Sequence, residues 1–314
     1  MSALSPIVLF VYNRPRHTLQ TLTALSANTL ASQSILYIYS DGPANDSPGL
    51  AENIAKTRQI IRDRPWCKEV IIKESDFNKG LAASITQGVT EVIRKHGRVI
   101  VLEDDIVTSP GFLQYMNDAL ECWKDEEQVM HISGHMYRLN IPMPETVFLN
   151  VVTPWGWGTW DRAWRYFVDD AKLLLNKLHN FKGFSQETYN RGYGQEFYKQ
   201  ITANADGSMR TWAVKWHTVI YLMNGACLHP GGSLTENIGF DGSGENSGKD
   251  TAYRITELRQ SVKVEKIEIQ ERPDVLKAFA EHYAWFASKG IPHTSLLTKG
   301  INFLKRVRLT LLPK

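Results

Sequence analysis

The sequence predicts an α/β protein in which helices flank a mostly parallel central sheet and a helical extension follows at the C-terminus. In the first hundred residues, short β-branched apolar runs alternate with longer segments whose apolar residues recur at helical spacing. The apolar run 98–102 then ends in three consecutive carboxylates, Glu103, Asp104 and Asp105. A strand of this composition is buried on both faces in a parallel sheet, and ligands bind at the carboxyl ends of such strands.

The elements that lead to these acids alternate regularly between two periods. Pro15 suits the first turn of a helix, and Leu19, Leu22 and Leu25 follow it at helical spacing. This alternation requires right-handed crossovers and hence parallel strands. We expect strands at 7–11, 35–39, 70–72 and 98–102, with helices starting at 15 and at 47 and a third over 81–95.

The chain after the acids is less regular. We predict helices at 112–123, 173–178, 211–222 and 274–288, and strands at 129–133, 225–230 and 262–269, the last as a sheet edge.

The composition indicates a soluble or peripheral protein with a sizeable core. The chain has 314 residues, of which 43% are hydrophobic and 22% charged, and its formal net charge of +3 implies no nucleic-acid partner. Cys67, Cys122 and Cys227 lie far apart without paired spacing, which predicts no disulfide or zinc site and favours a reducing, cytoplasmic location. No segment approaches the ~20 apolar residues that span a bilayer.

The three adjacent carboxylates repel one another unless a cation lies between them. A hard divalent ion that also binds the phosphates of a nucleotide is the simplest such cation. The alternative is that Asp105 caps the turn that leads to Pro110. The first strand ends in Tyr-Asn-Arg-Pro (12–15), without the glycine-rich pattern of dinucleotide-binding or P-loop proteins. A carboxylate-held metal is therefore the better interpretation of phosphate binding.

Four short motifs follow one another in a fixed order along the predicted elements. Val-Tyr-Asn-Arg-Pro (11–15) follows the first strand, Ser-Asp-Gly (40–42) follows the second, Asn-Lys-Gly-Leu (78–81) opens the third helix, and Glu-Asp-Asp (103–105) follows the fourth strand. From about Pro6 to Gly248 the chain resembles GT-A glycosyltransferases, most of all bacterial family-2-like sugar transferases. It is more distantly similar to inverting N-acetylglucosaminyltransferases that also carry Glu-Asp-Asp. The resemblance implies the Rossmann-like GT-A fold.

The resemblance also implies roles for single residues. Asp105 would hold Mn²⁺ or Mg²⁺ on the diphosphate of a nucleotide sugar. Asp41 and the 78–80 segment have an equally good interpretation as a turn and a helix cap. The glycine-rich loop 233–248 would close over the nucleotide as a lid. The residues expected to contact the donor are Tyr12, Asn13, Arg14, Asp41, Asn78, Lys79, Gly80, Glu103, Asp104 and Ser243.

A tryptophan- and glycine-rich stretch at 153–164 predicts a sugar-binding surface, because indole rings stack on the apolar faces of sugars. We assign Trp155, Gly156 and Trp157 to the cleft that binds the acceptor or the donor sugar. Trp160 and Trp164, which are spaced i and i+4, are expected to form the buried side of a helix.

The general base is not evident from the sequence. An inverting transfer needs a carboxylate that takes the proton of the acceptor hydroxyl. The relatives carry Trp-Asp near the start of the helix that corresponds to 211–222, whereas this chain has Trp212-Ala213. The candidates, which the sequence does not rank, are Asp206, Glu236 and Asp241, and a retaining or impaired enzyme stays an alternative.

We therefore expect a glycosyltransferase that moves a sugar, as a UDP-sugar, to a hydroxyl of a surface glycan or lipid-linked acceptor. The chain would comprise a nucleotide-sugar-binding half (1–135), an acceptor-binding and catalytic half of the same domain (136–260), and a C-terminal strand with a basic amphipathic tail (261–314). The basic stretch 296–309 suits either an anionic membrane surface or a helix docked on the domain. A sugar-phosphate nucleotidyltransferase and a non-catalytic glycan-binding protein are the other classes considered.

Overall fold

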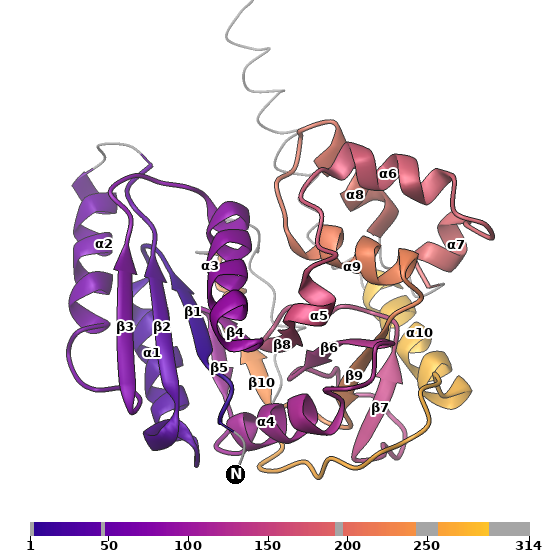
Figure 1. Ribbon diagram of the computed structural model, residues 1–314, viewed down its shortest axis with the longest axis horizontal. Coiled ribbons are helices and arrows are strands. Elements are labelled where there is room, and N and C mark those ends of the chain that lie inside the picture. Colours follow the sequence, from indigo (N-terminus) through magenta and orange to yellow (C-terminus); the bar gives the residue numbers. More distant parts are fainter. Residues whose placement is uncertain (1–2, 45–47, 192–196, 243–256, 289–314) are drawn as a thin grey trace, which may run out of the picture.

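The computed structural model describes residues 3–44, 48–191, 197–242 and 257–288. Its central sheet has eight strands in the order β3-β2-β1-β4-β8-β6-β9-β7 (Figure 1). Within this sheet β8 and β7 run antiparallel to the other strands. The strands are β1 (Ile7–Val11), β2 (Ile35–Ser40), β3 (Glu69–Glu74), β4 (Arg98–Glu103), β6 (Val129–Ser133), β7 (Thr146–Leu149), β8 (Trp157–Trp160) and β9 (Ala226–Pro230). The predicted α/β class is confirmed.

Helices cover both faces of this sheet, as the composition of β1 requires. Val8 and Phe10 face one hydrophobic core together with residues of α3, α5 and α9. Ile7 and Leu9 face a second core on the opposite side, with residues of α1 and α4. The helices are α1 (Pro15–Ser26), α2 (Pro48–Ile60), α3 (Leu81–His96), α4 (Phe112–Cys122), α5 (Asp161–Trp164), α6 (Ala171–His179), α7 (Gln186–Tyr189), α8 (Phe197–Ala205), α9 (Ala213–Leu222) and α10 (Pro273–Ser288).

A small second sheet lies beside the end of β4. It pairs β5 (Ile106–Thr108) antiparallel with β10 (Thr235–Asn237). Because β5 begins directly after the acidic triplet, this pairing brings residues from the C-terminal half of the chain to the acids. The carboxyl ends of β1, β2 and β4 meet at the same edge of the central sheet.

Two predictions about the second half of the chain are wrong. Residues 262–269 form no strand; the segment is irregular and is fastened by bonds from Lys263 N and Arg259 to Glu145, although Val262 is buried. The edge position beside β9 is filled by β7 instead. Trp160 ends β8 rather than sharing a helix with Trp164, although both indoles are buried as expected.

The predicted C-terminal helix is confirmed as α10, whose Val275, Ala278 and Phe279 join the core that contains Val8 and Phe10. The basic stretch 296–309 lies outside the described residues. Among the helices that the structure describes, none has the length and apolar character needed to cross a membrane.

Candidate functional site

The predicted residues come together at the carboxyl ends of β1 and β4. Glu103 is the last residue of β4, and Asp104 and Asp105 form the turn into β5. Arg14 lies at the N-terminus of α1, directly after β1, the parallel neighbour of β4. Segments about ninety residues apart in sequence thus meet because two parallel strands end at one edge.

Arg14 is the cation that lies between the carboxylates. Its Nη2 is 2.6 Å from Asp104 Oδ1 and 2.6 Å from Asp105 Oδ2, and its Nε is 3.2 Å from Asp104 Oδ1. The side chain of Arg14 is only 15% exposed, and Asp104 and Asp105 are buried. Thr21 Oγ1 donates to the Asp104 carbonyl oxygen at 2.9 Å and fixes the turn. Charge-assisted bonds in a site shielded from water are strong, so this arrangement is well defined.

One guanidinium does not balance three carboxylates. Burial, followed by the charges of Asp105 and Asp104, raises the pKa of Glu103 to about 8. Burial also raises the pKa of Asp104 to about 7, although Arg14 opposes the rise, and it raises the pKa of Asp105 in the same way. Raised carboxylate pKa values mean that the site favours a further positive charge.

The donor atoms fit Mn²⁺ or Mg²⁺ in kind, because both ions prefer carboxylate oxygens. Among the described residues, however, no three His, Cys, Asp or Glu side chains are grouped so that they could hold a metal ion. A protein cage is therefore lacking in this part of the chain. The residues fit an ion that is shared with oxygens of a ligand, the usual situation for Mg²⁺ on a phosphate.

A covering segment, residues 237–241, lies against the triplet. Ile238 N donates to the Asp105 carbonyl oxygen at 2.9 Å, and the backbone of Gly239 packs directly on the Asp105 carboxylate. Asp241 Oδ2 lies 3.2 Å from Nε2 of His17 in α1. The pairing of β10 with β5 holds the start of this segment, so it is part of the site as it stands.

Gly239→Ala is expected to lower the free energy of unfolding by about 1–3 kcal/mol, because a Cβ at this position overlaps Asp105 Oδ2 and also comes within 3.1 Å of Arg14 Nη1. Urea denaturation measures the loss. Gly49→Ala in α2 is the matched control, because a Cβ there meets no atom within 4 Å. A loss in Gly239→Ala no larger than in Gly49→Ala would contradict the close packing of the covering segment.

Asp41 has the loop-forming role that was one of its two interpretations. Its carboxylate accepts bonds from the backbone N–H groups of Gly42, Lys79 and Gly80, at 2.9–3.1 Å. Asn78 Nδ2 donates to the Gly42 carbonyl oxygen at 3.1 Å. The second and third motifs therefore form one unit that sets the start of α3.

Tyr12 and Asn13 of the first motif, which were also predicted to contact the nucleotide sugar, lie at this edge of the sheet. Tyr12 Oη accepts a bond from Ala44 N at 3.3 Å. Asn13 is half-buried between Tyr12 and Arg14. Ser243 lies outside the described residues.

The three candidate bases lie in different places. Asp206 is exposed just after α8, where its carboxylate accepts bonds from Ser208, and no contact within the described part of the chain links it to the triplet. Glu236 lies in β10 opposite Val107. Asp241 lies in the covering segment, and its charge adds to the rise in the pKa of Asp105 that burial chiefly causes. Proximity therefore favours Asp241 and argues against Asp206.

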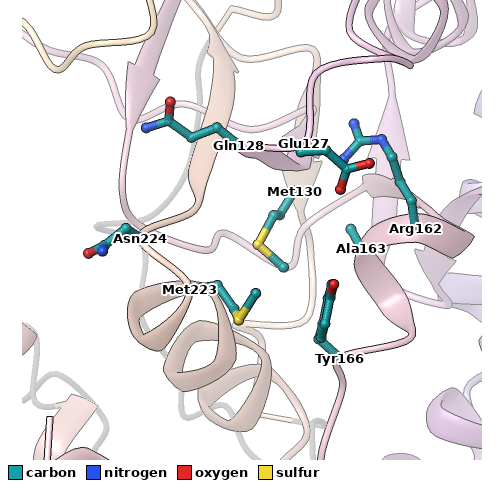
Figure 2. Close-up of a pocket in the computed structure, with 8 residues that line it drawn as sticks. All are labelled: Glu127, Gln128, Met130, Arg162, Ala163, Tyr166, Met223 and Asn224. Carbon is teal, nitrogen blue, oxygen red and sulfur yellow. The ribbon is translucent and has the colours of Figure 1, made fainter.

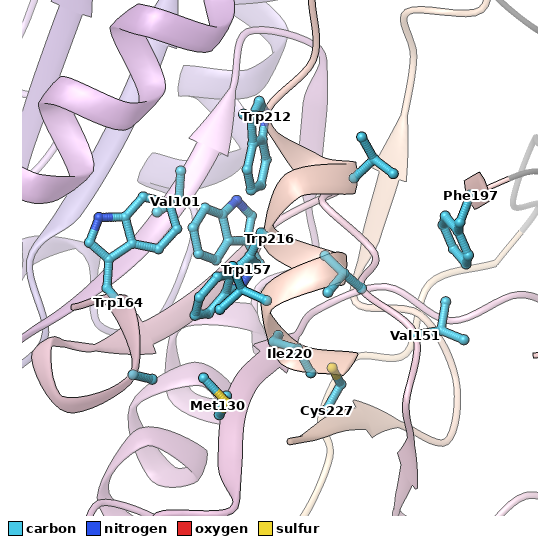
Figure 3. Close-up of a cluster of buried hydrophobic side chains, with 14 of the residues drawn as sticks. Val101, Met130, Val151, Trp157, Trp164, Phe197, Trp212, Trp216, Ile220 and Cys227 are labelled. Atoms are coloured by element: carbon cyan, nitrogen blue, oxygen red, sulfur yellow. The ribbon is translucent and has the colours of Figure 1, made fainter. Parts of the chain in front are cut away.

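Trp157 is not a cleft residue, which corrects the sequence-based assignment. It has 0% exposure in β8 and stacks on Trp212 at 4.8 Å and on His131 at 5.5 Å between ring centroids. Figure 3 shows it inside a cluster with Trp164, Trp212 and Trp216. Strand β8 pairs with β4 and β6 in the middle of the sheet, so its side chains enter the cores.

Trp155 and Gly156 do lie near the triplet. Trp155 is half-buried, with its ring 5.6 Å from Phe240 of the covering segment and 4.5 Å from His135. Gly156 is buried at a φ of 77°, a conformation that favours glycine. The assignment of these two residues to a sugar-binding surface stays a prediction.

Sequence reasoning missed three residues at the site: His17, Gly239 and Trp212. Burial raises the pKa of Glu103, and the side chain of Trp212 acts on it in the opposite direction. No motif marks His17, whereas Gly239 belongs to the glycine-rich loop whose composition was the available signal.

A separate pocket of about 430 Å³ lies at the N-terminal end of β6 and the C-terminal end of α9 (Figure 2). None of the predicted site residues lines it. Its lining residues are Glu127, Gln128, Met130, Arg162, Ala163, Tyr166, Met223 and Asn224.

Comparison with known proteins gives distant likenesses only. No family model matches the chain, and no curated protein matches it. A structure of S. aureus TarS is 12% identical with a TM-score of 0.32, over 49% of this chain and 28% of the TarS chain. UDP-glucose pyrophosphorylase complexed with UDP-glucose is 7% identical with a TM-score of 0.36, over 73% of this chain and 91% of that one.

The galactosyltransferase LgtC in complex with donor and acceptor sugar analogs is 8% identical with a TM-score of 0.35, over 69% of this chain and 70% of that one. This chain thus spans 28% of the length of TarS. At these values the likeness says nothing about activity, which depends on the residues at the site.

Proposed function

We propose that this chain is a metal-dependent glycosyltransferase that moves a sugar from a nucleotide-diphosphate donor, a UDP-sugar, to a hydroxyl of a surface glycan or lipid-linked acceptor. The observation that carries the proposal is the group of three carboxylates with a single guanidinium at the carboxyl ends of β1 and β4. Because three adjacent carboxylates share one guanidinium at this edge of the sheet, the site suits a cation brought with a diphosphate.

In this proposal Asp105 holds Mn²⁺ or Mg²⁺, which when bound offsets the negative charge that develops on the departing diphosphate. Glu103, the last residue of β4, accepts a hydrogen bond from a hydroxyl of the donor. The half-buried ring of Trp155 offers an apolar face to a sugar ring.

Asp241 is the candidate base that the geometry favours for an inverting transfer. Its side chain is 51% exposed and lies beside His17, within the covering segment that touches Asp105. A carboxylate here would take the proton of the acceptor hydroxyl as that hydroxyl attacks the anomeric carbon. A peripheral membrane contact through 296–309 and a cytoplasmic location belong to the same proposal.

A sugar-phosphate nucleotidyltransferase usually carries a glycine-rich loop with a basic residue after its first strand, whereas β1 is followed by Tyr-Asn-Arg-Pro (12–15). A glycan-binding protein without catalysis has no need of buried acids. Burying carboxylates costs free energy, which favours a site that uses them.

Calorimetry with UDP tests the proposal. We expect UDP to bind in the presence of Mn²⁺ and at least a hundredfold more weakly in EDTA, a difference of ~2.7 kcal/mol. Asp105→Asn should abolish the effect of Mn²⁺, whereas Asp118→Asn, which loses only a bond from Gln114 on α4, should retain it. UDP binding of equal strength with and without Mn²⁺ would refute metal dependence, and no UDP binding under either condition would refute the proposed function.

A further inference from the structure

Arg14 and Asp105 are bonded to each other, although the proposed function gives them different partners. The proposed function places the metal ion on Asp105, and Arg14 is one of the residues expected to contact the nucleotide-sugar donor. In the structure a single nitrogen, Arg14 Nη2, lies 2.6 Å from both Asp104 Oδ1 and Asp105 Oδ2. The positive charge next to Asp105 is therefore supplied by the protein itself.

The surroundings of Asp105 Oδ2 leave little room for a second cation. Arg14 Nη2 occupies one side of this oxygen, and the backbone of Gly239 packs against it. A divalent ion bound at about 2.1 Å from Oδ2 would lie within about 5 Å of Nη2. Two cations so close in a site shielded from water repel strongly. The guanidinium and the ion therefore compete for Oδ2 of Asp105.

The contacts of Arg14 show how its guanidinium could break the bond to Asp105 and stay bonded to Asp104. Asp104 Oδ1 accepts from both Nε and Nη2, so Asp104 can act as a pivot after the Asp105 contact is lost. Nη1 is buried and has no hydrogen-bond partner among the described residues, although it lies toward Gly239 of the covering segment. A guanidinium with an unused N–H donor is well suited to a phosphate oxygen, which it binds in a forked geometry.

We propose that Arg14 is a resident cation of the acidic triplet, and that binding of a divalent ion together with a nucleoside diphosphate moves its guanidinium from Asp105 to the phosphates. This inference rests on the proposed function and adds a partner exchange to it. The ion alone must compete with Arg14 for Asp105. With the diphosphate present, the displaced guanidinium gains a new anion, so the diphosphate relieves that competition.

The exchange predicts opposite effects of Arg14→Gln on the two ligands. Without nucleotide, the variant should bind Mn²⁺ at least about tenfold more tightly than the wild type, measured from the electron paramagnetic resonance signal of free Mn²⁺. At saturating Mn²⁺ it should bind UDP at least about tenfold more weakly, measured by calorimetry. Arg98→Gln is the matched control, because Arg98 pairs with Glu121 at the opposite end of β4 and should change neither affinity.

An arginine that merely supports the structure would move both affinities in the same direction, and that result overturns the inference. Circular dichroism checks that the variant is folded. If Arg14→Gln does not fold, nuclear magnetic resonance of the wild-type arginine Nε–H groups decides, with the Arg14 signal assigned by its loss in Arg14→Lys. This signal should shift with Mg²⁺ and UDP together and much less with Mg²⁺ alone.

An Arg14 signal that does not move at saturating Mg²⁺ and UDP also overturns the exchange. The proposed function fails separately, because in that case the wild type binds no UDP at any Mn²⁺ concentration. If the wild type binds UDP and Mn²⁺ but Arg14→Gln changes both affinities in the same direction, the exchange is wrong. The transferase proposal is not affected by that result.

Discussion

Trp157→Ala is expected to lower the free energy of unfolding by about 3–5 kcal/mol, the range for removing a large aromatic side chain from a core. Trp157 is fully buried and stacks between Trp212 and His131, so alanine leaves a cavity that two rigid elements, β8 and the start of α9, cannot easily close. Urea denaturation followed by circular dichroism measures the change, since intrinsic fluorescence is altered by the substitution itself.

Two further variants show whether burial is the cause. Trp157→Phe keeps most of the ring stack and removes an indole N–H that has no hydrogen-bond partner in the described segments, so it should cost about 1.5 kcal/mol or less. Trp155→Ala removes a half-buried ring and should cost less than half as much as Trp157→Ala. Equal losses in the two alanine variants would place Trp157 at the surface and restore the sequence-based assignment.

The tryptophan stretch shows what composition cannot decide. Four indoles among glycines are compatible with both a sugar-binding surface and a core. The structure assigns Trp157 to the core because Gly158 lets β8 approach its neighbours: a Cβ there would come within 2.9 Å of the Val99 carbonyl oxygen. That contact joins residues far apart in sequence, and periodicity within the segment does not report it.

The first half of the fold could be predicted because each element carries its own signal. In β1 the apolar run is buried on both faces, and α3 shows its buried stripe at Ile85, Val89 and Val92. The error at 262–269 has a different origin. Alternation of apolar and polar residues predicts only that a segment can form an edge strand. In the structure the edge position beside β9 is taken by β7, a strand that the sequence analysis did not predict.

Only the residues of the site that directly follow a predicted strand could be placed from the sequence. Glu103, Asp104, Asp105 and Arg14 follow apolar runs directly, so their meeting at one sheet edge follows from the parallel order. The sequence did not predict that Arg14 itself is the cation between the acids. The parallel strand order indicates which residues lie near one another, but it does not show which side chains form ion pairs. The contacts of Gly239 and His17 depend on the path of the covering segment, which no local pattern determines.

Acid is expected to destabilise the protein through four buried neutral histidines, the second large effect. Burial lowers the pKa of His131 and His135 to about 3 and that of His217 and His229 to about 4. In the unfolded chain these histidines have an ordinary pKa of about 6.5. Between about pH 6.5 and pH 4 the unfolded chain therefore binds protons that the folded chain does not bind. Stability is complete above about pH 6.5 and falls as the pH decreases toward 4.

The expected size is about 2 kcal/mol per histidine at pH 5, or about 8 kcal/mol for four, comparable with the whole stability of many domains. Glu103 and Asp104 act in the opposite direction. Their folded-state pKa values of about 8 and 7 mean that the folded chain takes up protons first, which stabilises it as the pH falls from 8 toward 4.5. The wild-type curve is thus a difference between two large effects.

His217→Gln separates the histidine effect from that of the carboxylates. His217 is buried against Phe197 and Tyr189, and its environment contains no member of the triplet. Glutamine loses packing, so the variant should be less stable at pH 7.5. Because it also loses the proton-linked penalty, its stability deficit relative to the wild type should shrink by about 2 kcal/mol at pH 5.

Urea denaturation of both proteins at the two pH values measures this change, with Trp157→Phe as the control, since it removes no titratable group. The carboxylate contribution is common to all three proteins and cancels in each difference. A deficit of His217→Gln that stays constant from pH 7.5 to pH 5 would mean that His217 binds a proton as readily in the folded chain as in the unfolded one. The core around α9 would then be open to water, contrary to the close packing of His217 against Phe197 and Tyr189.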